Sequence, residues 1–168
     1  MATPTSATTT PKPAGQSKPP KALMMVMNPV LSALLRSPFH SRLSSGLMLL
    51  TFTGRKSGKQ YTTPVAYHRV GPMLRVFTDS PWYKNLRGGA PVTMLLQGQQ
   101  RRGQATVVDD PEVVYQVVHD FLREKGADHA RELGLMSLDR TRPPTEAELH
   151  AVLVGRVIVE IRPEGAGA

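Results

Sequence analysis

A short basic segment is the first place in this sequence where residue types and spacing indicate chemistry. Residues 53–59 read Thr-Gly-Arg-Lys-Ser-Gly-Lys, which puts three cations, a serine and two glycines in one tight loop. Glycines let the backbone approach an anion closely, and the Ser57 hydroxyl and backbone N–H groups can donate to it. Arg55 can bind a phosphate or carboxylate group through two parallel hydrogen bonds, whereas Lys56 and Lys59 act as point charges. The segment predicts an anion-binding loop, although a solvated basic hairpin would have the same composition.

The spacing is not that of the phosphate-binding loop of NTPases. Only three residues separate Gly54 from Gly58, Gln60 stands where that motif has Ser or Thr, and a strand pattern follows instead of a helix.

A second segment, residues 81–89, places aromatic rings beside an amide and cations. It reads Pro-Trp-Tyr-Lys-Asn-Leu-Arg-Gly-Gly and contains the one tryptophan of the chain. An aromatic ring next to an amide suits a planar ligand whose edges form hydrogen bonds. Trp82 and Asn85 are therefore candidate ligand contacts, and the alternative for Trp82 is that it closes one end of a barrel.

Amino-acid composition limits the kinds of ligand, metal and macromolecule that the protein can bind. The 168 residues hold 21 Lys and Arg against 13 Asp and Glu, a formal charge of +8, which favours an anionic partner. The absence of cysteine excludes disulfides, thiolate metal sites and iron–sulfur clusters. The five histidines lie too far apart in the sequence to indicate a metal site. Nucleic-acid binding is disfavoured, because the cations are scattered without interleaved aromatic residues.

The chain divides into a tail, a helical segment and a strand-rich domain. We expect a disordered tail over residues 1–21, an amphipathic helical segment over 22–45, the main domain over 46–163 and a flexible C-terminus over 164–168. The Asn28-Pro29 and Ser37-Pro38 pairs predict short helices over 29–36 and 38–45. Pro29 also interrupts the apolar stretch and disfavours a signal peptide, so we expect a cytoplasmic protein. Basic residues around this stretch leave peripheral contact with the inner face of the membrane as an alternative.

Strand patterns dominate the main domain. We expect strands over residues 47–53, 61–70, 73–79, 91–97, 101–109 and 152–162, a helix over 111–125, a short helix near 146–149, and irregular or weakly helical structure over 127–145. Pro64 indicates an edge position or a bulge, and Gly98 the turn of a hairpin. Strands joined by short turns, without regular strand–helix alternation, predict a small antiparallel barrel with helices outside.

Both motifs occur within longer runs that resemble one protein family. Residues 49–71, LLTFTGRKSGKQYTTPVAYHRVG, and 74–96, LRVFTDSPWYKNLRGGAPVTMLL, closely resemble the deazaflavin (coenzyme F-420)-dependent nitroreductase-like oxidoreductases of the split β-barrel group. The resemblance extends over about residues 29–163. Its specific part is the ordered pair of motifs, T-G-R-K-S-G followed by T-P, and then W-Y-x-N-L.

The resemblance implies a mainly β (α+β) fold, a six-stranded antiparallel split β-barrel with flanking helices, usually dimeric, with a deazaflavin in a groove. The basic loop would hold the phosphodiester and glutamyl tail of coenzyme F-420, and the strand after it would lie against the ring. The implied contacts are Arg55, Lys56, Ser57 and Lys59 for the tail, Thr63, Pro64 and Val65 for the ring, Phe77 and Thr78 as walls, and Trp82 and Asn85 near the cofactor.

The implied activity is hydride transfer from the reduced deazaflavin to a small hydrophobic acceptor such as an enone, a quinone or a nitro compound. Tyr67 and Tyr83 are proton-donor candidates, whereas a surface role is expected for His68. The loop over residues 79–81 is shorter than in some nitroreductase members, which disfavours nitroimidazole-type substrates.

The sequence leaves two alternative functions open. A split barrel can bind FMN, another flavin-like ligand or a tetrapyrrole, although a single phosphate would need fewer cations than this loop supplies. A non-catalytic binder of lipid or fatty acid at a membrane surface would instead use the apolar segment over residues 23–35.

Overall fold

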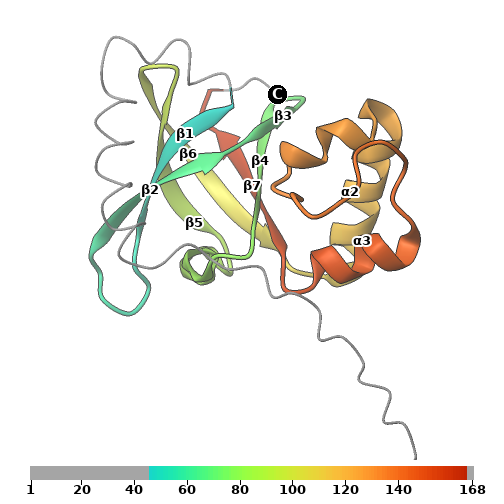
Figure 1. Cartoon of the computed structure of the whole chain (residues 1–168). Helices are drawn as coiled ribbons and strands as arrows, with labels where there is room; N and C mark the ends of the chain where they lie inside the picture. Colours follow the sequence, from blue (N-terminus) through green and yellow to red (C-terminus); the bar gives the residue numbers. More distant parts are fainter. Residues whose placement is uncertain (1–45, 166–168) are drawn as a thin grey trace, which may run out of the picture.

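A β-barrel and an adjoining group of helices make up residues 46–165, the part of the chain that the computed structural model describes (Figure 1). The elements are β1 Leu47–Thr53, β2 Gln60–Ala66, β3 His68–Val70, β4 Met73–Thr78, the 3-10 helix η2 Pro81–Leu86, β5 Ala90–Leu96, β6 Gln99–Val108, α2 Pro111–Lys125, the 3-10 helix η3 Ala127–Arg131, α3 Glu146–Leu153 and β7 Val157–Pro163. The tail and the two helices expected over residues 1–45 lie outside the described residues.

The strands form one antiparallel sheet that curls into a barrel. Their order is β2-β1-β5-β6-β7-β4-β3, so β2 and β3 are its two edges although they follow each other in the chain. Pro64 lies on β2, where it pairs with Leu49 of β1 alone. The predicted edge position of Pro64 is confirmed, because an edge strand tolerates the missing N–H group. The mainly β, antiparallel split-barrel fold is also confirmed.

The described sheet has seven strands rather than the expected six, because the segment over residues 61–70 breaks at Tyr67. The Tyr67 N–H donates to the Gly46 carbonyl at 2.9 Å, and the side chain is buried in the barrel. The hairpin between β5 and β6 turns at Gln97 and Gly98, both at positive φ, one residue earlier than expected. The last strand begins at Val157 instead of 152, because α3 continues through Leu153.

Two groups of buried side chains stabilise this arrangement. The first fills the barrel, where alternate residues of β1 point inward, as Met48, Leu50 and Phe52 show. The second lies between the helices and the outer face of the sheet, and it includes Val114, Val118, Leu122, Leu149 and Ile158.

Helix α2 forms where its pattern predicted, and Asp110 caps it by accepting the N–H groups of Glu112 and Val113. The helical spacing of the apolar residues in 111–125 predicts Val113 on the buried stripe of this helix. It is exposed, because it lies in the first turn beside the cap.

His68 is half-buried, so the expected surface role is wrong. Only 16% of its side chain is exposed, and its ring lies edge-on to Phe77 at 5.9 Å and to Phe121 at 5.5 Å. One ring nitrogen, Nε2, is 3.0 Å from the Glu132 carbonyl oxygen. His68 lies on the outer face of the sheet, and the helices cover that face at β3 and β4.

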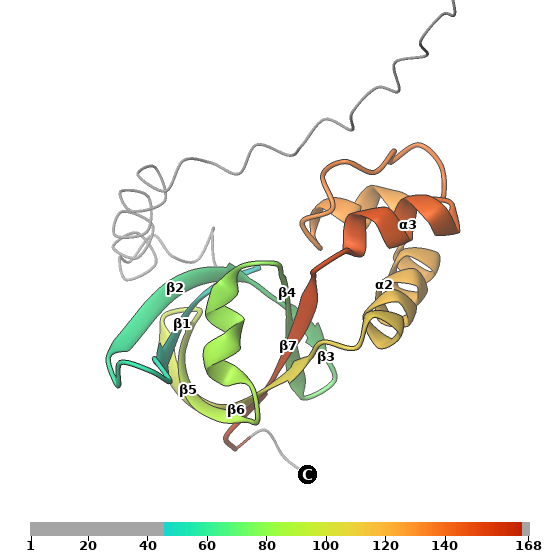
Figure 2. The same ribbon diagram turned by 90° about the horizontal axis from the view of Figure 1, so that it is seen from below.

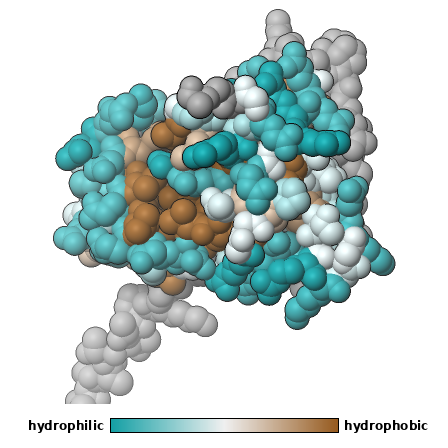
Figure 3. All heavy atoms as spheres, turned by 180° about the vertical axis from the view of Figure 1, so that it is seen from behind, coloured by the Kyte–Doolittle hydropathy of each residue, from teal (hydrophilic) through white to brown (hydrophobic). Residues whose placement is uncertain are grey.

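The 3-10 helix η2 covers one end of the barrel (Figure 2). Figure 2 shows η2 lying across one end of the barrel, with the helices α2 and α3 to one side. Seen from behind, apolar side chains gather in one area within a mostly polar surface (Figure 3).

Over residues 46–165 there is no helix with the length and hydropathy needed to cross a bilayer.

Candidate functional site

The basic loop between β1 and β2 is held in one closed conformation by its own backbone. The Gly54 N–H donates to the Lys59 carbonyl at 2.7 Å, and the Gly58 N–H donates to the Gly54 carbonyl at 2.8 Å. Gly54 is buried, and a Cβ there would lie 2.5 Å from the Tyr61 ring and 2.7 Å from Ser57 Oγ. Only glycine therefore fits at this end of the loop without a shift of its neighbours.

The cations of the loop are exposed and uncompensated. Within residues 46–165, Arg55, Lys56 and Lys59 form no ion pair with a carboxylate. The backbone N–H groups of Lys56 and Ser57 donate to no acceptor in the same part of the chain. Three positive side chains and two N–H groups are thus available to an anionic ligand.

An aromatic row connects this loop to the end of the barrel. The rings of Tyr61 and Phe52 stack with centroids 6.0 Å apart, and those of Phe52 and Trp82 stack at 5.6 Å. The Tyr61 hydroxyl lies 3.2 Å from Ser57 Oγ, which also accepts the Lys59 N–H at 3.3 Å. Tyr61 is 46% exposed and Phe52 only 4%, so the apolar surface beside the cations is the face of the Tyr61 ring.

Asn85 joins the loop to the helix η2. Its Oδ1 atom accepts the Arg55 backbone N–H at 3.1 Å, and its Nδ2 atom donates to the Trp82 carbonyl at 2.9 Å. The loop is therefore fixed from both sides, by Tyr61 in β2 and by Asn85 in η2.

A hydroxyl-lined groove starts beside the loop and continues over the outer face of the sheet. A cavity of about 320 Å³ is bordered by Thr53 and Gln60, the residues that flank the loop, and by Arg102 of β6. It shares Thr51 and Thr93 with a second cavity of about 320 Å³ further along the same face. The groove offers polar contacts to an extended ligand that begins at the loop.

The structure brings most of the predicted tail and ring contacts into one cluster. Arg55, Lys56, Ser57, Lys59, Trp82 and Asn85 all belong to the loop or to η2. Thr63 and Pro64 are half-buried on β2, and Val65 lies inside the barrel.

Other predicted residues lie apart from this cluster. Phe77 packs against the helical core and the His68 ring, and Thr78 Oγ1 accepts the Ser80 N–H at 3.0 Å. Of the two proton-donor candidates, Tyr67 is 4% exposed within the barrel. The Tyr83 ring is half-buried under the Arg87 guanidinium, 5.5 Å from its centroid.

Two residues of the candidate site, Phe52 and Tyr61, were not predicted from the sequence. A signal for Tyr61 was present, because an aromatic residue with a hydroxyl follows the basic loop at once. No sequence signal marked Phe52 apart from its position in an alternating strand pattern, because its contact with Trp82 joins residues 30 positions apart.

Comparison with known proteins identifies the family. The family model described as F-420H(2)-dependent quinone reductase matches residues 38–128, more than half of the chain. The chain belongs to this family. It is an F-420-dependent reductase, as the two motifs implied, although the matching family is that of quinone reductases rather than nitroreductases. No curated protein sequence matches the chain.

Several solved structures are similar to it at low identity. A pyridoxamine 5'-phosphate oxidase-related, FMN-binding protein from Nostoc punctiforme has 15% identity and a TM-score of 0.47 over 89% of this chain and 83% of its own. A putative pyridoxamine 5'-phosphate oxidase from Listeria innocua has 12% identity and a TM-score of 0.45, covering 81% and 91%. A structure described as an F-420 reductase has 15% identity and a TM-score of 0.39, covering 80% and 93%.

The donor set of the site fits coenzyme F-420. Its tail carries a phosphodiester and glutamate carboxylates, and the loop offers three exposed cations that form no ion pair within residues 46–165. Its ring is planar and largely apolar, and the exposed Tyr61 ring offers it an apolar face beside the loop.

Proposed function

We propose that this reductase transfers a hydride from reduced coenzyme F-420 to a small hydrophobic acceptor of the quinone or enone type, with nitro compounds as further acceptors. The observation that carries the proposal is the fixed basic loop, whose uncompensated cations stand next to the aromatic row. A polyanionic tail and a planar ring on one ligand match these two surfaces.

Each part of the site has its own task. Arg55, Lys56 and Lys59 bind the anionic tail, while Asn85 and the Tyr61 hydroxyl keep the loop in place for it. The exposed Tyr61 ring, which Phe52 supports from below, orients the coenzyme ring. When bound and reduced, the coenzyme supplies a hydride from its ring carbon.

The proton that a reduced acceptor needs has three candidate sources among the tyrosines. Tyr61 is the most exposed at 46%, and its hydroxyl lies at the loop, whereas Tyr67 is enclosed in the barrel. Tyr83 is half-buried beside Arg87. The Tyr61 hydroxyl therefore joins the two candidates named from the sequence, and it is the one that solvent can reprotonate most directly.

A titration tests the cofactor assignment. The purified chain is titrated with oxidised F-420 and, separately, with FMN, and binding is followed by fluorescence. We expect micromolar affinity for F-420 and binding of FMN weaker by about tenfold or more, because FMN has one phosphate to pair with the loop. Tighter binding of FMN, or binding of neither, would overturn the assignment.

A turnover assay tests the acceptor. Reduced F-420 is mixed with the enzyme and menadione, and its oxidation is followed by absorbance. We expect oxidation that depends on both enzyme and quinone. If F-420 binds but neither menadione nor a cyclic enone is reduced, the acceptor class is wrong while the cofactor assignment stands.

A further inference from the structure

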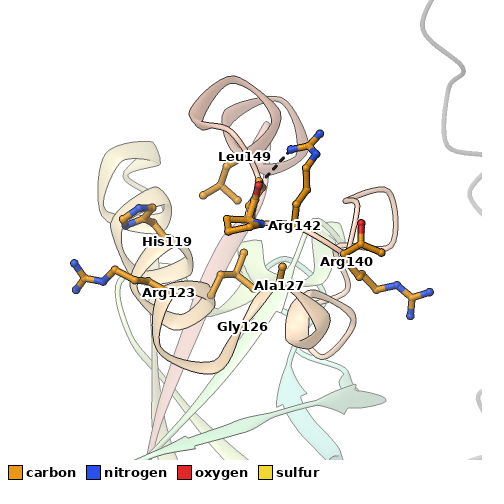
Figure 4. A pocket seen from close by; sticks show the side chains of 11 residues that line it. His119, Arg123, Gly126, Ala127, Arg140, Arg142 and Leu149 are labelled. Carbon is orange, nitrogen blue, oxygen red and sulfur yellow. Dashed lines mark hydrogen bonds between the residues drawn. The ribbon is translucent and has the colours of Figure 1, made fainter.

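A separate cavity of about 370 Å³ lies among the helices (Figure 4). Helix α2 contributes His119, Leu122 and Arg123, η3 contributes Ala127, and α3 contributes Leu149. The opposite wall is the segment over residues 140–144. No lining residue belongs to the basic loop, the aromatic row or the groove beside them, so the cavity is independent of the cofactor site.

The wall over residues 140–144 is held rigidly by its own polar contacts. Asp139 Oδ1 accepts from the Thr141 backbone N–H at 2.9 Å and from its hydroxyl at 2.7 Å. Arg142 donates two hydrogen bonds to the Glu148 carboxylate, at 2.9 and 2.6 Å, and Glu148 in turn closes a capping box with Thr145. The cavity is thus formed before any ligand arrives, which lowers the cost of binding.

The interior of the cavity is apolar. Leu122 and Leu149 are buried, and Ala127, Pro143 and Pro144 add further apolar surface beside them. A cavity of this size and lining is at the lower end of the range for small-molecule sites. An aliphatic chain or a single aromatic ring would bury its surface here.

The rim of the cavity is positively charged. Arg123, Arg140 and Arg142 line it, and no carboxylate is among the lining residues. Arg123 lies 3.2 Å from Asp120 and Arg142 pairs with Glu148, whereas Arg140 has no carboxylate partner within residues 46–165. Figure 4 shows the Arg123 and Arg140 side chains extending away from the cavity on opposite sides of it. Exposed side chains change rotamer within nanoseconds, so Arg140 can turn towards a charged group at the rim.

We propose that this cavity binds a small amphipathic carboxylate, with an aliphatic or aromatic body on the apolar floor and the charged end at the rim. The site is a second one, outside the redox centre, and it is open whether or not coenzyme F-420 is bound. Octanoate has the required size and charge, and octan-1-ol is its uncharged counterpart.

Calorimetry and NMR with the full chain test the proposal. Octanoate is titrated with and without saturating F-420, and the methyl signals of Leu122 and Leu149 are followed. We expect one site, shifts of both methyl signals, and equal affinity in the two conditions. Unmoved Leu122 and Leu149 signals, or competition by F-420, would overturn the site.

Two variants separate the apolar floor from the charged rim. Ala127→Phe fills the cavity and should weaken octanoate by about tenfold or more, while Ala151→Phe on the exposed side of α3 should not. Arg140→Gln should weaken octanoate by about threefold without affecting octan-1-ol, and Arg162→Gln on β7 is its matched control. Equal losses for acid and alcohol would contradict the charged rim. Wild-type affinity in a folded Ala127→Phe variant would contradict the cavity, and the NMR titration decides the matter if that variant does not fold.

Discussion

The Asn85 side-chain oxygen accepts the backbone N–H of Arg55 at 3.1 Å, across 30 positions of sequence. The same amide donates to the Trp82 carbonyl, so one side chain fixes the basic loop to the helix that carries the tryptophan. Asn85 thereby determines the position of the loop cations relative to the aromatic row. Its effect on cofactor binding acts through the loop, which makes it a positioning residue.

Replacing Asn85 by Ala should weaken F-420 binding while leaving the chemical step nearly intact. Loss of one hydrogen bond to the loop costs about 1 kcal/mol, or roughly fivefold in Kd. The measurement is the KM for F-420 against kcat at saturating cofactor, where KM should rise and kcat should change little. Gln116→Ala removes an exposed amide from α2 and serves as the control. An unchanged KM in Asn85→Ala would show that the loop does not depend on this bond.

The Tyr61 hydroxyl and the Tyr61 ring should have separable effects. Tyr61→Phe removes only the 3.2 Å contact with Ser57 Oγ, so F-420 affinity should fall by about 0.5–1.5 kcal/mol with little change in Tm. Tyr61→Ala also removes the stacking on Phe52 and should lower Tm as well. Fluorescence titration and thermal unfolding of both variants make the comparison. If Tyr61→Phe binds F-420 as the wild type does, the hydroxyl has no part in holding the loop.

The cations of the loop should carry most of the salt dependence of binding. Arg55→Ala and Lys56→Ala should each lose about 1–3 kcal/mol of F-420 binding, as expected for charge-assisted hydrogen bonds. Wild-type affinity should fall as NaCl rises, and more gently in the variants, because screening acts on the charges that they lack. Arg162→Ala, which removes an exposed cation from β7, should match the wild type. Equal salt slopes for all four proteins would argue against a polyanionic ligand at the loop.

Local sequence patterns described the basic loop better than they described its surroundings. The T-G-R-K-S-G loop is closed by contacts within six residues, so its glycines and cations already describe its chemistry. The edge position of Pro64 and the helix after Asp110 likewise depend on backbone rules that act over a few residues.

Contacts between distant segments account for what the sequence did not predict. Tyr67 lies inside the barrel and His68 outside it. No local sequence pattern marks the break in the strand between them or the helices that cover His68. The stacking of Phe52 on Trp82 depends on η2 crossing the end of the barrel. Such contacts come from packing across the whole domain, for which these segments carry no local pattern.

Gly54 should be intolerant of even a methyl group. In Gly54→Ala the new Cβ would meet the Tyr61 ring and Ser57 Oγ, so the loop and the aromatic row must move apart. We expect a loss of about 1–3 kcal/mol in the free energy of unfolding, together with weaker F-420 binding. Gly46→Ala is the matched control, because a Cβ there meets nothing within 4 Å. Urea unfolding of both variants gives the comparison, and equal stabilities would contradict the close approach at Gly54.

Acid should destabilise the helices through Glu148. Hydrogen bonds from Arg142 and from the Thr145 backbone and hydroxyl lower the pKa of this carboxyl from its ordinary 4.5 to about 2. Because the folded-state pKa is the lower one, the contribution to stability is complete above pH 4.5 and is lost as the pH falls towards 2. In Glu148→Gln the group does not titrate, so its Tm should be below that of the wild type at pH 7 and should converge with it near pH 2. Thermal unfolding of both proteins across this range makes the test. Two curves that stay parallel from pH 7 to 2 would mean that the Arg142–Glu148 pair adds nothing to the stability of the folded chain.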